Sequence, residues 1–70
     1  MKKSFEIPVY NVDVRTAVQN KQNHPSFEAK WADTHLILVR AHTSEEAVTI
    51  CRRQHPEKLG FVLGEVSEAI

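Results

Sequence analysis

Cysteine and glycine are scarce in this chain of 70 residues, which has one cysteine and two glycines. The single cysteine, Cys51, has no partner for a disulfide within the chain, whereas secreted domains of this size usually carry several bridges. We therefore expect a reducing compartment, the cytoplasm. The two glycines, Gly60 and Gly64, do not form the glycine-rich loop that cradles phosphate groups.

Long apolar runs are also absent. The longest, residues 36–39, is far shorter than the ~20 residues that a membrane helix needs. The basic start at residues 1–4 resembles the beginning of a signal peptide, but Glu6 and Pro8 interrupt any apolar stretch behind it. We expect neither a membrane span nor an export signal.

Charge of one sign is not in excess, because nine basic side chains balance nine acidic ones. No overall field attracts nucleic acid, an anionic membrane or an acidic substrate. Apolar residues make up 41% of the chain, which is too many for a disordered protein. A chain this short has room for one hydrophobic core, so we expect one domain over residues 1–70.

The first strand is indicated by Phe5, Ile7 and Val9, which alternate with polar residues and with Pro8. Proline cannot donate a hydrogen bond to a neighbouring strand, so this strand should lie at a sheet edge or contain a bulge.

Residues 12–19 allow two interpretations. After a bulge, the strand continues with the opposite residues facing inward. Alternatively, Asp13 caps a helix that has Val14, Ala17 and Val18 on one face. We favour the strand.

The middle of the chain predicts a loop followed by a hairpin. Residues 19–26 are polar and contain a proline, which is typical of a loop. Phe27, Ala29 and Trp31 then alternate with charged residues, and turn-forming residues 32–34 lead into the apolar segment 35–41.

A helix over residues 43–55 has the clearest local signals. Thr43 and Glu46 are spaced as a capping box, in which the threonine hydroxyl accepts a hydrogen bond from the N–H of Glu46. Arg52 and Arg53 lie near the negative end of the helix dipole, and Pro56 prevents continuation.

A closing strand over residues 59–66 completes the pattern, and we expect the four residues that follow to be frayed. The segments together predict an α+β domain. Its three- or four-stranded, mostly antiparallel sheet carries one helix on one face, in the order β-β-β-α-β.

Catalytic chemistry has little support in the sequence. Cys51 and His55 are one helical turn apart and allow a thiol–imidazole pair, but Cys51 shares a stripe with Ala47 and Ile50 and reads as a buried structural cysteine. The spacing of the histidines does not suit a zinc site. We expect no enzyme, no metal and no cofactor.

The segment 35–41 has apolar residues on both faces, although a strand beneath one helix needs only one. If residues 37, 39 and 41 lie under the helix, the others look outward, unless the first strand or the preceding loop covers them. An apolar patch with a polar rim often marks a partner surface. The predicted partner-binding residues are Leu36, Leu38, Arg40 and Trp31.

A nucleic-acid-associated module is the alternative function. The residues that would form its basic patch are Arg40, Arg52, Arg53 and Lys58. Acidic residues occupy the same stretch of sequence, so a solvated face is the simpler interpretation, and we do not expect nucleic acid as the main partner.

Residues 31–66 resemble a group of small phage proteins. The shared pattern is Trp31-Ala32, a strand, the motif Thr43-x-x-Glu46-Ala47 at a helix start, then Pro56, Gly60-Phe61 and an apolar strand. It is similar to the host RNA polymerase inhibitors of T7-like phages and to other short phage and plasmid accessory proteins.

This resemblance implies a non-enzymatic domain that acts inside a bacterial host cell by occupying a surface of a host complex, such as RNA polymerase or a CRISPR effector. The partner that we expect is a host protein or protein complex, and a second copy of the chain is possible at the same surface.

Overall fold

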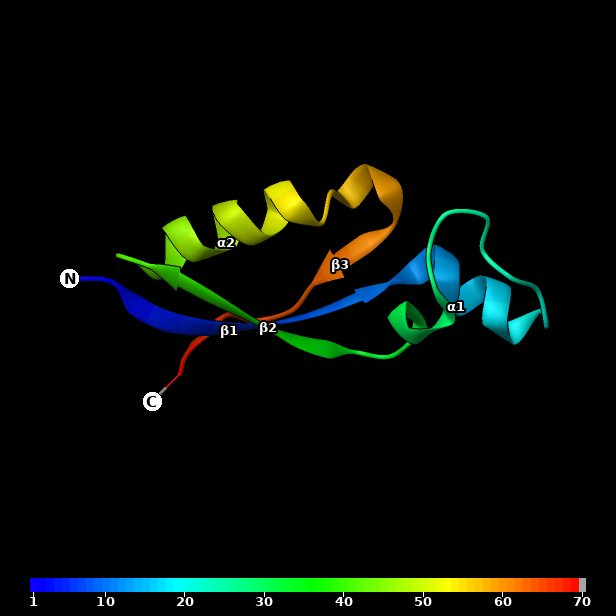
Figure 1. Ribbon diagram of the computed structural model, residues 1–70, viewed down its shortest axis with the longest axis horizontal. Helices are drawn as coiled ribbons and strands as arrows, with labels where there is room; N and C mark the ends of the chain where they lie inside the picture. The colour runs from blue at the N-terminus through cyan, green and yellow to red at the C-terminus, as the bar shows by residue number, and fades with distance from the viewer. Residues whose placement is uncertain (70) are drawn as a thin grey trace.

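The computed structural model describes residues 1–69, which form an elongated α+β domain of 45 × 21 × 15 Å (Figure 1). In chain order the elements are β1 (Lys3–Asn11), α1 (Val12–Gln19), the 3-10 helix η1 (Ala29–Ala32), β2 (His35–Ala41), α2 (Ser44–Gln54), the 3-10 helix η2 (Glu57–Leu59), β3 (Phe61–Leu63) and β4 (Ser67–Glu68). Helix α1 and the segment leading to β2 lie at the end of the molecule away from both termini.

The sheet is antiparallel and has β1 in its centre. Strand β2 pairs with one side of β1, with Ile7 opposite Ile37. Strands β3 and β4 pair with the other side, with Val9 opposite Leu63 and Phe5 opposite Glu68. The predicted α+β class and the antiparallel sheet are confirmed.

The position of Pro8 in the sheet agrees only in part with the prediction of an edge or a bulge. The edge position is wrong, because β1 has neighbours on both sides. The Pro8 carbonyl accepts a hydrogen bond from the N–H of Gly64 at 2.6 Å, so the proline nitrogen turns to the same side. There, β3 has ended at Leu63 and β4 begins only at Ser67. The missing donor of Pro8 thus falls where the neighbouring strand is broken.

The favoured interpretation of residues 12–19 as a strand is wrong, because they form helix α1. Its cap is Asn11, whose Oδ1 accepts hydrogen bonds from the N–H groups of Asp13 and Val14 at 2.9 and 3.0 Å. The Nδ2 group of Asn11 donates to the carbonyl of Leu59 at 3.0 Å. The residue that caps α1 is therefore held in place by Leu59, which is 48 positions away in the chain.

The predicted hairpin is also wrong, because η1 replaces its first strand. Phe27 and Trp31 pack edge-on against Phe61, with ring centroids 5.0 and 5.3 Å apart. These rings cover one end of the core instead of pairing within the sheet. The order therefore differs from the predicted β-β-β-α-β, and the domain has two α-helices.

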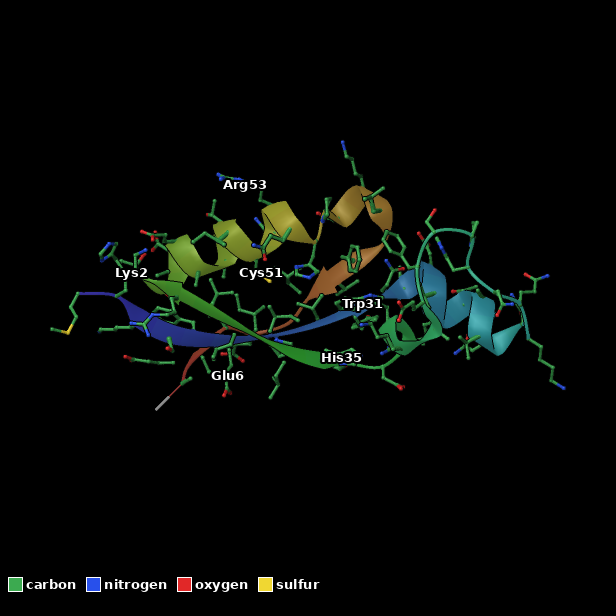
Figure 2. The ribbon with its side chains drawn as sticks, viewed as in Figure 1. Lys2, Glu6, Trp31, His35, Cys51 and Arg53 are labelled. Atoms are coloured by element: carbon green, nitrogen blue, oxygen red, sulfur yellow. The ribbon has the colours of Figure 1, made fainter. Side chains whose placement is uncertain are left out.

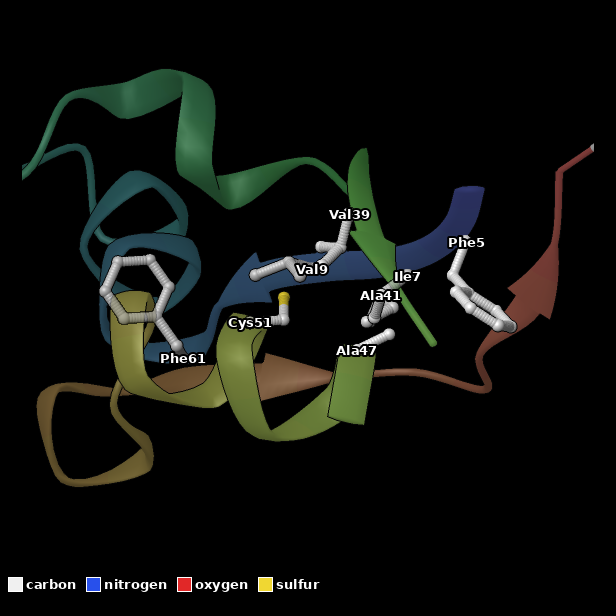
Figure 3. Packing of buried hydrophobic residues seen from close by; sticks show 8 residues of the cluster. All are labelled: Phe5, Ile7, Val9, Val39, Ala41, Ala47, Cys51 and Phe61. Carbon is white, nitrogen blue, oxygen red and sulfur yellow. The ribbon is translucent and has the colours of Figure 1, made fainter. Parts of the chain in front are cut away.

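Helix α2 matches the helix predicted over residues 43–55. The hydroxyl of Thr43 accepts a hydrogen bond from the N–H of Glu46 at 3.1 Å, and the last helical residue is Gln54. The helix lies along one face of the sheet, which we call the inner face (Figure 1). The buried core between them consists of Phe5, Ile7, Val9, Val39, Ala41, Ala47, Cys51 and Phe61 (Figure 3).

We expect Thr43→Ala to lower the free energy of unfolding by about 1 kcal/mol, because it removes this cap. Chemical denaturation measures the change as a lower midpoint. The control is Thr49→Ala on the same helix, where the hydroxyl bonds only to the Glu45 carbonyl one turn earlier. Equal midpoints for the two variants would show that Thr43 does not stabilise the start of α2.

The end of the chain is more ordered than predicted. The closing strand is shorter than residues 59–66, since β3 is Phe61–Leu63. Ser67 and Glu68 form β4, and the N–H of Ala69 donates to the carbonyl of Ser4 at 2.8 Å. The expectation of a frayed end is wrong for residues 67–69, and Ile70 lies outside the described residues.

Candidate protein-binding surface

The face of the sheet opposite α2 carries the two most exposed leucines of the fold. Side chains alternate along β2, so Val39 and Ala41 are buried beneath α2 while Leu36 and Leu38 project to the other side. Leu36 is 65% exposed and Leu38 is 63% exposed. The apolar excess predicted for residues 35–41 therefore lies uncovered.

This surface extends across β1 to β3. Leu36 lies opposite Pro8, and on the far side of Pro8 is Gly64, which has no side chain to cover the proline ring. Tyr10 lies opposite Val62, which is 36% exposed. We use the term outer face for the surface formed by Leu36, Leu38, Pro8, Tyr10, Val62, Ser4, Glu6 and Arg40.

Opposite charges lie together at one end of the apolar part of the outer face. Glu6 lies opposite Leu38, and Arg40 lies opposite Ser4 near the end of β2. Arg40 is exposed and Glu6 is half-buried. An apolar strip that ends beside one acid and one base lacks the clustered positive charge that nucleic acid needs.

Tyr10 is held in place by a neighbouring arginine. The Arg15 guanidinium carbon lies 3.7 Å from the centre of the Tyr10 ring, and its Nε donates to the carbonyl of Ala32 at 2.8 Å. This pair joins α1, β1 and η1 at one end of the outer face. Pro8 and Tyr10 were not among the predicted partner-binding residues, although both alternate with buried Phe5, Ile7 and Val9.

Trp31 does not belong to the outer face, which corrects the predicted site. Its ring is half-buried, with centroids 5.4 Å from His35, 5.5 Å from His55 and 5.3 Å from Phe61. Phe61 is a core residue and His55 directly follows the last residue of α2, so this cluster lies on the helix side of the sheet. The packing of η1 on the core takes Trp31 away from the two leucines.

The four basic residues of the alternative site are not brought together. Arg40 is on the outer face, whereas Arg52 and Arg53 are exposed on α2, on the other side of the sheet. Figure 2 shows Arg53 pointing away from the sheet. Lys58 lies on η2, beyond the end of α2. A single basic patch containing all four is therefore not formed.

Cys51 lies on α2 and His55 directly follows the helix, and their side chains lie close together. Cys51 is fully buried beneath α2, and this burial raises the pKa of its thiol (Figure 3). His55 Nδ1 is 3.7 Å from the sulfur and 3.0 Å from the carbonyl oxygen of Cys51. A carbonyl only accepts, so this contact is a hydrogen bond in the tautomer that has its proton on Nδ1, and in that tautomer Nδ1 has no lone pair for the thiol proton.

Two recesses lie beside α2 and share Arg52 in their walls. Their volumes are about 240 and 280 Å³, below the range of roughly 300–1,000 Å³ that is usual for small-molecule sites. Neither of these recesses contains Cys51 or His55.

Metal-ligating side chains and helix lengths can be described for residues 1–69. Within them, His, Cys, Asp and Glu do not gather in groups of three or more that would hold an ion. The helices of the same residues fall short of the length and apolar character needed to cross a membrane.

The chain matches no protein-family model, no curated protein and no solved structure. The role of the outer face must therefore be inferred from its own geometry.

Proposed function

We propose that this protein is a small, non-enzymatic binding domain that attaches to a larger protein through its outer face. The observation that carries the proposal is the exposure of Leu36 and Leu38, at 65% and 63%, on a face that α2 leaves open. Contiguous apolar surface of this kind on a soluble domain commonly marks a partner site.

The chemistry of the outer face indicates the kind of partner. Leu36, Leu38 and Pro8 offer a flat apolar strip, so the partner presents an apolar patch of similar shape. An acidic group facing Arg40 and a basic group facing Glu6 would complete the rim. Because the protein has no formal net charge, we expect salt to change this affinity only weakly.

The resemblance of residues 31–66 to small phage proteins supports a host complex as the target, with RNA polymerase or a CRISPR effector as the classes to test first. Occupancy is the mechanism, since the binding domain blocks the surface that it covers. The proposed setting is the cytoplasm of a bacterial host.

The decisive experiment replaces both leucines. Truncating an interface anchor commonly costs about 2 kcal/mol, which is a thirtyfold loss of affinity. We expect Leu36→Asp with Leu38→Asp to abolish capture of the target from a bacterial lysate by tagged protein. Exposed leucines contribute little to the core, so circular dichroism should show a folded variant.

Leu59→Asp is the matched control, because Leu59 is 46% exposed but lies on η2, outside the outer face. It should capture the target as the original chain does. Capture by the double variant at the original level would overturn the proposal. Unfolding of the double variant would overturn it too, because the leucines would then be core residues.

A further inference from the structure

We propose that a second copy of this chain pairs with the free edge of β2, so that two sheets join into one. Strand β2 is the outermost strand on its side, in the order β2-β1-β3. The inference goes beyond the proposed function, because it concerns the backbone edge of β2 and not the outer face.

The direction of the backbone groups in β1 follows from its hydrogen bonds. The carbonyl of Pro8 accepts from Gly64, and the carbonyl of Ser4 accepts from Ala69. Even-numbered residues of β1 therefore turn their N–H and C=O groups toward β3 and β4. Since the two sides alternate along a strand, odd-numbered residues turn theirs toward β2.

The same alternation identifies the free groups of β2. Odd-numbered residues of β1 lie opposite odd-numbered residues of β2, so these pairs form the hydrogen bonds within the sheet. Leu36, Leu38 and Arg40 then direct their N–H and C=O groups outward, at the edge. Three consecutive outward positions are a template for a second strand.

Strand β2 lacks most of the usual protections of an edge, and Arg40 is its one charged residue with its histidine neutral. It contains neither proline nor lysine, and its pairing with β1 is unbroken from Val9↔His35 to Lys3↔Ala41. The opposite edge is different, because β3 is three residues long and is interrupted before β4. The long, regular edge is therefore the one that suits pairing.

When two β2 strands pair antiparallel, the residues that direct their N–H and C=O groups to the free edge must lie opposite each other. These residues all have even numbers, so the two-fold axis between the strands passes at a residue and not between two residues. An axis at Ile37 places Leu36 beside Leu38 of the second copy, and this contact occurs twice by symmetry. An axis at Leu38 would instead place Leu38 beside Leu38 of the second copy and Leu36 beside Arg40. The first register keeps both leucines beside leucines and is the one that we propose.

The same register keeps charge away from the two leucines. With the axis at Ile37, Arg40 faces Thr34 of the second copy, so neither leucine lies beside a charged residue. The protein has no formal net charge to oppose self-association.

Sedimentation equilibrium of the full chain tests the pairing. We expect the mass to rise with concentration from 8.0 kDa to twice that value. A mass that stays at that of one chain throughout would overturn the proposal and leave the edge to a strand of another protein.

A charge pair placed at the two leucines tests the register. Leu36→Glu alone and Leu38→Lys alone should each weaken the dimer about tenfold, because each sets a charge opposite a leucine at both contacts. The variant with both changes should restore it. Arg53→Glu, on the far side of α2, is the control and should leave the dimer unchanged. A doubly changed variant as weak as either single one would overturn the pairing.

The two proposals fail separately. A chain that dimerises but captures no target contradicts the proposed function and keeps the pairing. A chain that captures its target as a monomer contradicts the pairing and keeps the proposed function.

Discussion

Replacement of Asn11 by alanine should lower the free energy of unfolding by about 2–3 kcal/mol, a large fraction of the stability of so small a domain. Asn11 is fully buried and makes three hydrogen bonds, two at the start of α1 and one to the carbonyl of Leu59. Alanine removes the cap and leaves the Leu59 carbonyl without its side-chain donor. Urea denaturation followed by circular dichroism measures the loss.

The matched control for this change is Asn20→Ala at the other end of α1. Asn20 is exposed, so its replacement should alter the midpoint little. Asn11→Ser keeps an oxygen for the cap but cannot reach Leu59 in the same way, and its stability should lie between alanine and asparagine. If Asn11→Ala were as stable as Asn20→Ala, the junction between α1 and η2 would not stabilise the fold.

Gly60→Ala should destabilise the same junction, by about 3 kcal/mol. Gly60 has φ +97°, a conformation that side chains disfavour. A Cβ atom there would lie 2.7 Å from Oδ1 of Asn11 and 2.5 Å from Oδ2 of Asp13. Exposed Asp13 can move aside, but buried Asn11 cannot do so without losing its hydrogen bonds to α1.

Gly64→Ala provides the comparison, since this glycine is exposed and the atoms nearest to its added Cβ would belong to the Pro8 ring, at 3.2 Å. We expect a loss below about 1 kcal/mol there. Both variants are compared by thermal unfolding. A loss at Gly60 no greater than that at Gly64 would contradict the strain and the close contact inferred at the junction.

The junction explains why one half of the fold was predictable and the other was not. Helix α2 carries its own signals, with Thr43 at one end and Pro56 beyond the other, so local sequence was sufficient. Helix α1 begins at Asn11, which is held by Leu59. The N–H of Val12 also donates to the carbonyl of Gly60, at 2.8 Å. A contact across 48 positions leaves no mark in a short window of sequence.

The candidate site divides in the same manner. Alternation along residues 35–41 correctly separated Leu36 and Leu38 from the residues beneath α2. Trp31 was misplaced because its alternation with Lys30 suggested a strand, whereas the residue lies in η1 and packs near Phe61. Pro8 and Tyr10 joined the outer face only when β1 was known to lie in the centre of the sheet.

The sequence by itself determined the α+β class, the position of α2 and the two faces of β2, because each of these follows from periodicity and capping within a few neighbouring residues. Tertiary structure decided whether residues 12–19 became a helix, where Trp31 packed and whether the outer face stayed open. Those outcomes depend on contacts between distant segments, such as those of Asn11 with Leu59 and of Phe61 with Trp31. The free energies of such contacts exceed the weak local preferences of the residues involved.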